Sequence, residues 1–131
     1  MIGIDTNILV RYLTQDDPEQ FQQAVTVLEQ QCTVEVPGYI STIVLCELMW
    51  VLQRAYNIPR MQQADVINRL LHVPTLKVAQ ATVVRHALDD FQQHSADFAD
   101  CLIGRLHQAA GCTTTVTLDR KAGRLETFEA L

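Results

Sequence analysis

Four acidic residues in separate parts of the chain are the candidates for chemistry: Asp5, Glu47, Asp100 and Asp119. Carboxylate oxygens are the ligands that hard divalent cations such as Mg²⁺ prefer. A cation held by such acids can activate water and offset the charge on a departing oxygen, which suits the hydrolysis of a phosphodiester bond. Clustered carboxylates repel one another when no cation is bound. We therefore expect a metal-dependent hydrolytic site that uses all four acids.

Glu47 is the only charged residue between Thr42 and Gln53, in a segment that is otherwise almost wholly apolar. Burying an unpaired carboxylate is costly, so a charge here predicts that the group is paired, protonated or bound to metal. The simpler alternative is a glutamate on one solvent-facing stripe, or one paired with Arg11 or Arg54. We favour the functional interpretation.

Asp5 and Asp119 each follow a short run of strand-forming residues, at 1–4 and 113–118 respectively. Asp5 could instead be only a helix cap. Asp119 could be only a turn residue that bonds its own backbone two residues on. Neighbouring polar residues are candidates either for supporting the carboxylates or for simple capping: Thr6, Asn7, Thr115 and Thr117.

Asp97 and Asp100 are three residues apart in a predicted helix over 96–110, capped by Ser95, so both should point to one face. Two acids there could share a cation. Asp97 has an alternative role as a first-turn carboxylate favoured by the helix dipole. Asp100 lies one turn further in, and Gly104 four residues later leaves room on its face. We therefore rank Asp100 above Asp97.

These acids need a scaffold, and the chain alternates short apolar runs with segments of helical periodicity. Alternating strands and helices predict an α/β fold, with a mostly parallel sheet covered on both faces and sites beyond the carboxyl ends of its strands. Strands are expected at 1–4, 33–40, 76–79 and 113–118; helices are expected at 8–14, 18–31 and 42–56, from Pro59 to Pro74, around Val84 to Phe91, and at 96–110.

The 131 residues suit a single domain over 1–131, and a hydrophobic fraction of 48% with 19% charged residues is typical of a globular protein. We expect no membrane segment and no secretory signal, hence a cytoplasmic protein. The net charge of −5 argues against an overall basic nucleic-acid surface. A local basic rim after Asp119 could still contact RNA: Arg120, Lys121 and Arg124.

Neither cysteines nor histidines show metal-ligand spacing, so zinc is not expected. The cysteines are expected to be buried free thiols: Cys32, Cys46, Cys101 and Cys112.

The motifs together resemble the PIN-domain ribonucleases, and specifically the VapC toxins of bacterial toxin–antitoxin pairs. They are D-T-N at 5–7, E-L at 47–48, A-D-F-A-D-C-L-I-G at 96–104 and T-L-D at 117–119. Each motif is short, but their order and spacing across nearly the whole chain make the resemblance specific.

The resemblance implies a three-layer α/β/α sandwich with Mg²⁺ or Mn²⁺ as cofactor and RNA as substrate. It implies Asp5 and Asp100 as metal ligands, Asp119 completing the site and Glu47 orienting metal-bound water. Asp97 would be either a ligand or a supporting residue. It also implies a homodimer and a separate antitoxin, whose tail would occupy an apolar groove and the acidic site.

Two other functions stay open at this point. A magnesium-dependent phosphatase or phosphotransfer domain also places acids at strand ends, although a D-x-D site would need an aspartate where Asn7 stands. A non-catalytic PIN-fold module that binds RNA or protein would keep the fold without the reaction. The four intact acids argue against that last alternative.

Overall fold

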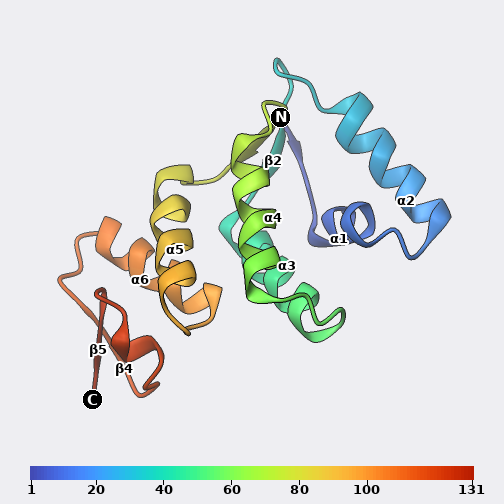
Figure 1. Ribbon diagram of the computed structural model, residues 1–131. Coiled ribbons are helices and arrows are strands. Elements are labelled where there is room, and N and C mark those ends of the chain that lie inside the picture. The colour runs from blue at the N-terminus through green and yellow to red at the C-terminus, as the bar shows by residue number, and fades with distance from the viewer. The chain divides into compact units, whose positions relative to one another are not determined.

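The computed structural model describes residues 1–131, which divide into two compact units, Met1–Ala79 and Gln80–Leu131. The elements of the N-terminal unit are β1 (Ile2–Gly3), α1 (Thr6–Thr14), α2 (Pro18–Val25), η1 (Thr26–Gln31), β2 (Gly38–Ile40), α3 (Thr42–Arg54), α4 (Arg60–His72) and β3 (Leu76–Val78) (Figure 1). Those of the C-terminal unit are α5 (Ala81–Gln93), α6 (Phe98–Ala109), β4 (Thr115–Thr117), η2 (Ala122–Arg124) and β5 (Phe128–Ala130). The prediction of a single domain stays a prediction.

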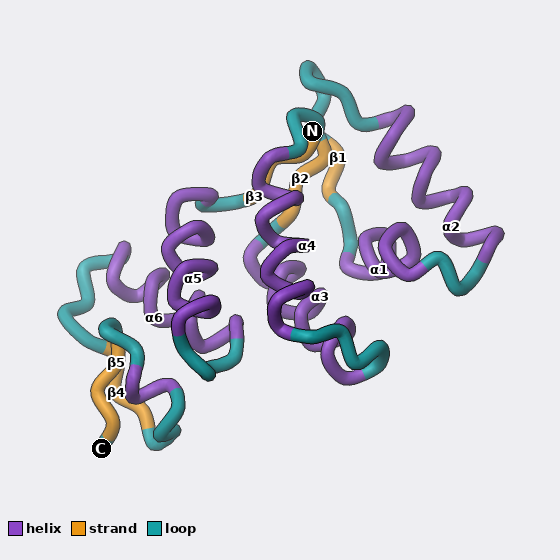
Figure 2. Tube along the Cα trace, viewed as in Figure 1, coloured by secondary structure: helices purple, strands orange, loops and turns teal.

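The strands of the N-terminal unit form one parallel sheet in the order β1-β2-β3 (Figure 2). Ile2 is paired with Gly38, and Gly38 with Leu76. Because the strands are parallel, the chain leaves β1 toward α1 and leaves β2 toward α3 at the same edge of the sheet. This edge carries Asp5 and the start of the helix that contains Glu47.

Helix α3 has one buried face and one exposed face. Its buried face consists of Leu45, Leu48, Met49 and Leu52. On the opposite stripe Ile43 is 72% exposed and Trp50 45% exposed, and Glu47 and Arg54 lie on the same stripe. The expectation that this apolar segment buries Glu47 is therefore wrong for this stripe, because apolar residues there face outward.

The C-terminal unit is built on the pair α5 and α6. Phe91 and Phe98 pack edge to face, with their ring centroids 5.8 Å apart. Arg105 of α6 donates two hydrogen bonds to the Asp90 carboxylate of α5, from Nε to Oδ2 at 2.7 Å and from Nη2 to Oδ1 at 2.8 Å. These two parallel hydrogen bonds between a planar guanidinium and a carboxylate fix how α5 and α6 pack. Strands β4 and β5 form a separate parallel pair.

The α/β class with parallel strands is confirmed, and all the predicted helices are present. The strands are shorter than predicted: β2 spans only 38–40 and β4 only 115–117. The predicted helix over 18–31 changes at Thr26 to π-type hydrogen bonding. Strand β5 was not predicted, because Phe128–Ala130 lacks the β-branched run that marks β4. None of the helices combines the length and apolar character needed to cross a membrane.

Gly104 lies where α6 passes close to the chain leading into β5. A Cβ built there would overlap the Thr127 hydroxyl and would lie 2.7 Å from a ring carbon of Phe128. The sequence predicted open space on the helix face of Asp100, because Gly104 has no side chain. Thr127 fills this space, and its hydroxyl is buried without a hydrogen-bond partner. Only glycine permits this close packing.

We expect Gly104→Ala to lower the free energy of unfolding by about 1–3 kcal/mol, because the added methyl group forces a packed segment to move. Urea denaturation of the purified variant measures this. Gly3→Ala is the matched control, since a Cβ at Gly3 meets nothing within 4 Å. Equal losses in the two variants would contradict the packing argument.

Candidate functional site

Asp5 stands at the carboxyl end of β1 as the N-cap of α1. Its Oδ1 accepts a hydrogen bond from the Thr6 backbone nitrogen at 2.8 Å, and the residue is exposed. The simple interpretation of Asp5 as a cap is therefore confirmed. The Asp5 carboxylate can still bind another group, because Oδ1 and Oδ2 together offer several lone pairs and the capping hydrogen bond occupies only one.

Glu47 is linked to the start of α1 through Thr6. The Thr6 hydroxyl donates to Glu47 Oε1 at 2.7 Å, although 41 residues separate the two in sequence. Glu47 is exposed, so the inference from a costly buried charge is wrong, and the interpretation as a residue on a solvent-facing stripe is right. The Thr6 hydrogen bond is what fixes its carboxylate, so Thr6 is well placed to support an acid, as predicted.

Neither of the ion pairs considered as an alternative for Glu47 forms. Arg11 is paired with Asp16 at 3.0 Å. Arg54 lies over the Trp50 ring, 5.6 Å from its centroid. The carboxylate of Glu47 is therefore not neutralised by either arginine.

Asp100 is the centre of an acidic group in the C-terminal unit. Partial burial raises the pKa of the Asp100 carboxyl above its ordinary value, and the negative charges of Asp119 and Asp97 raise it further. Asp97, at the N-terminus of α6, and Asp119, after β4, thus both act electrostatically on Asp100. Arg105 gives no compensation, because its guanidinium is bonded to Asp90.

Asp97 is itself the N-cap of α6, and its side chain makes no capping hydrogen bond. The prediction that Ser95 caps this helix is wrong, since the helix begins at Phe98 rather than at residue 96. Asp97 is exposed and Asp100 is half-buried. The Asp97 carboxylate is therefore not engaged in capping the helix that it precedes.

Asp119 closes β4 with a tight turn. Its Oδ1 accepts hydrogen bonds from the backbone nitrogens of Lys121 at 2.7 Å and Ala122 at 3.0 Å. Its own nitrogen donates to the Thr117 hydroxyl at 3.0 Å. The interpretation as a turn residue is thus confirmed, and Thr117 bonds to the Asp119 backbone rather than to the carboxylate. Both bonds to the carboxylate use Oδ1.

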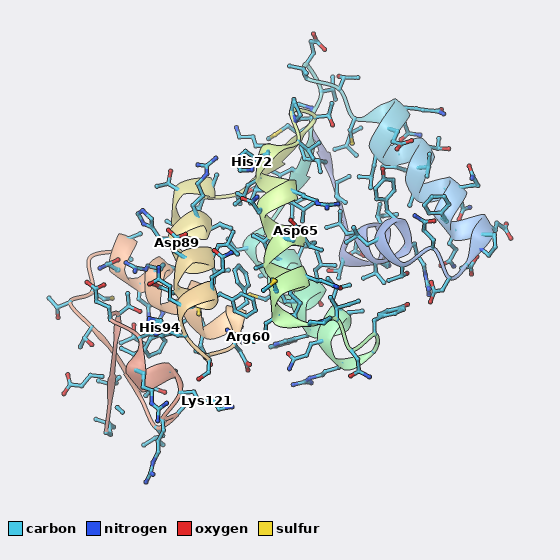
Figure 3. The ribbon with its side chains drawn as sticks, in the orientation of Figure 1. Arg60, Asp65, His72, Asp89, His94 and Lys121 are labelled. Carbon is cyan, nitrogen blue, oxygen red and sulfur yellow. The ribbon has the colours of Figure 1, made fainter.

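The predicted basic rim is exposed at every position: Arg120, Lys121 and Arg124. Lys121 lies beside η2 in Figure 3. These cations belong to the same unit as Asp100 and directly follow Asp119 in sequence. They are available to phosphate groups in solvent.

A polar hollow of about 380 Å³ lies between α1 and α2, lined by Asn7, Ile8, Arg11, Gln20 and Gln23. Asn7 was predicted only as a supporting residue, and the other polar members were not predicted. Their signal in the sequence was the spacing of Asn7 to Arg11 and of Gln20 to Gln23, which places each pair on one helix face.

No group of three or more His, Cys, Asp or Glu side chains lies close enough together to enclose a metal ion. The chemistry of the donors nevertheless fits Mg²⁺ or Mn²⁺, because every candidate ligand is a carboxylate. The cysteines are free, and burial raises the thiol pKa of Cys46. Cys112 is exposed, so the prediction of burial is wrong for that residue, which lies in the loop after α6.

The family model of the PIN domain matches residues 2–127. The matched span contains every acid described above. Comparison with curated proteins and with solved structures gives no match.

Proposed function

The chain belongs to the PIN domain family, whose members are typically metal-dependent nucleases, and from this premise we propose that it is a metal-dependent endoribonuclease. The observation that carries the proposal is that an acid after β4 and an acid at the N-terminus of α6 place negative charge on the half-buried Asp100. A protein keeps such an arrangement when a cation or substrate relieves the repulsion. RNA rather than DNA as substrate rests on the resemblance of the motifs.

In this proposal Asp5 and Asp100 hold Mg²⁺ or Mn²⁺, and Asp119 and Asp97 add negative charge that favours the cation. The bound metal supplies charge neutralisation for the phosphodiester and activation of water. Glu47 accepts a hydrogen bond from the Thr6 hydroxyl, which leaves Oε2 to orient the attacking water and take its proton. Thr6 therefore positions Glu47.

The exposed cations after Asp119 bind the RNA backbone in this proposal. A net charge of −5 makes non-specific binding to long RNA weak, so these local charges matter. Because such contacts neutralise phosphates, binding should weaken as salt concentration rises.

Incubation of the purified protein with a labelled single-stranded RNA tests the function directly. We expect cleavage with Mg²⁺ or Mn²⁺, none in excess EDTA, and recovery when the metal is restored. A DNA strand of the same sequence and a small aryl phosphate are the comparison substrates. Cleavage that persists in EDTA, or aryl phosphate turnover without RNA cleavage, would contradict the proposal.

We further propose that the protein is the toxin of a VapC-type pair and acts in the cytoplasm as a homodimer. An antitoxin with an apolar tail would bind it. Support comes from a hollow of about 410 Å³ in the N-terminal unit, lined mainly by apolar side chains that include Leu13, Leu28 and Leu70. Co-expression with the protein of the neighbouring reading frame should block cleavage, and light scattering should give twice the chain mass. A monomer that no neighbouring product inhibits would overturn this assignment.

A further inference from the structure

The hollow between α1 and α2 differs from the apolar hollow of the same unit in its chemistry. Of its lining residues only Ile8 is apolar. Asn7 and Arg11 lie one turn apart on α1, and Gln20 and Gln23 lie one turn apart on α2. Three amides and a guanidinium thus face one space of about 380 Å³, which is within the usual size of a small-ligand site.

The arginine in this hollow is held in place and its charge is balanced. Arg11 Nη1 donates to Asp16 Oδ1 at 3.0 Å. Asp16 also accepts hydrogen bonds from the Thr14 hydroxyl at 3.0 Å and from the Tyr56 hydroxyl at 2.7 Å. The Tyr56 bond, together with those from Thr14 and Arg11, lowers the pKa of Asp16, so its carboxylate is ionised at neutral pH.

A site with a neutralised arginine and several amides is better suited to a nucleobase than to a phosphate. An isolated cation would favour phosphate, whereas the Asp16 carboxylate would oppose it. Amide groups can donate and accept hydrogen bonds at the edge of a base. A planar guanidinium whose orientation is fixed can stack on the face of a base.

The hollow also begins close to a proposed metal ligand. Asn7 lies in the first turn of α1, and Asp5 is the N-cap of that helix. Arg11 is the sixth residue after Asp5, which corresponds to a rise of about 9 Å along the helix axis. A nucleotide neighbouring the cleaved phosphate is therefore within reach of this space.

We propose that the hollow between α1 and α2 binds one unpaired base of the RNA next to the scissile phosphate and thereby sets a nucleotide preference at that position. The inference rests on the proposed ribonuclease function, and it assigns Arg11, Gln20 and Gln23 as specificity-determining residues. Single-stranded RNA suits such a site because its bases are free to leave the stack.

The test measures binding rather than cleavage, in a protein that carries Asp100→Asn so that the RNA stays intact. Fluorescence anisotropy with Mg²⁺ compares short RNAs that differ in one nucleotide, and one RNA that lacks the base at that position. We expect the double change Gln20→Ala and Gln23→Ala to weaken binding of the preferred RNA about tenfold, which is the effect of losing about 1.4 kcal/mol. The preference among nucleotides should disappear as well.

Gln22→Ala is the matched control, because Gln22 is an exposed glutamine of the same helix that does not line the hollow. It should bind like the parent protein. For the parent, loss of the base should weaken binding as much as the double change does. Unchanged affinity and nucleotide preference in the double variant would overturn the inference. If the parent protein binds the RNA that lacks the base as tightly as the complete RNA, the inference is also overturned, because the contact is then to phosphate. Failure of the wild-type protein to cleave RNA would instead contradict the proposed function.

Discussion

Replacing Asp100 by asparagine is expected to lower the rate of RNA cleavage by about 10³-fold or more and to leave the fold intact. The change removes one charge while preserving shape, so a proposed metal ligand is lost at little cost in packing. Loss of a single group that stabilises developing charge typically costs about 10²–10³-fold in rate. Loss of a ligand also weakens cation binding, which adds to the effect.

The free energy of unfolding of Asp100→Asn, unlike its cleavage rate, should not fall. The pKa of Asp100 is raised in the folded protein by burial and by Asp119 and Asp97. Its ionised form therefore destabilises the metal-free fold, fully at pH values above the raised pKa, and this cost is lost as pH falls from the raised value toward the ordinary aspartate pKa. At neutral pH without metal, Asp100→Asn should thus have a free energy of unfolding equal to or higher than that of the wild type.

Single-turnover cleavage assays and urea denaturation of the same preparations test both expectations. Asp5→Asn should lose cleavage in the same way. Asp65→Asn is the control, since Asp65 is exposed on α4 (Figure 3) and its ion pair is with Arg69 one turn away. Full activity in purified Asp100→Asn or Asp5→Asn would remove these residues from the proposed site.

Arg105→Ala should have the largest effect on stability. Arg105 and Asp90 form the most buried ion pair, with exposed side-chain fractions of 16% and 9%. Truncating the arginine leaves the Asp90 carboxylate buried without its partner, which typically costs about 3–5 kcal/mol. Because the pair joins α5 to α6, the loss should also loosen the helix that carries Asp100.

The comparison variant is Arg69→Ala, which breaks an exposed i,i+4 pair with Asp65. Such surface pairs are typically worth about 0.3–0.5 kcal/mol. Replacing both partners of the buried pair, as Arg105→Met with Asp90→Leu, should cost less than Arg105→Ala because no charge is left unpaired. If all three proteins unfold at the same urea concentration as the wild type, the pair has no structural importance.

Local signals in the sequence account for the backbone roles of several residues. Asp5 caps α1 and Asp119 closes β4, which are the simpler roles that their positions after short strands suggested. Gly111, with a φ of 103°, follows the last turn of α6, where the residue type suits the left-handed conformation. In each case the cause lies within a few neighbouring residues.

Glu47 shows where sequence reasoning fails. The surrounding apolar residues suggested a buried charge, yet Ile43 and Trp50 face outward with it. Hydrophobicity alone cannot tell a buried face from an exposed apolar one, because much of a protein's surface is apolar. The hydrogen bond from Thr6 crosses from α1 to α3 and depends on the parallel sheet bringing the two helix starts to one edge.

The polar hollow was equally hidden, because its members come from two helices. The sequence shows helical spacing of amides on α2 but not which helix they face. Asp16, which fixes Arg11, itself depends on Tyr56, 40 residues further on. Long-range contacts of this kind become visible only once the fold is known.

The N-cap position of Asp5 has an evolutionary consequence. Asparagine caps a helix about as well as aspartate does, so an exchange at this position would remove a proposed metal ligand and keep the hydrogen bond to the Thr6 nitrogen. A gene copy with that exchange would encode a folded but inactive protein, able to occupy the same RNA or partner. Loss of the reaction would therefore not require loss of the protein, and a regulator could arise from an enzyme by one substitution.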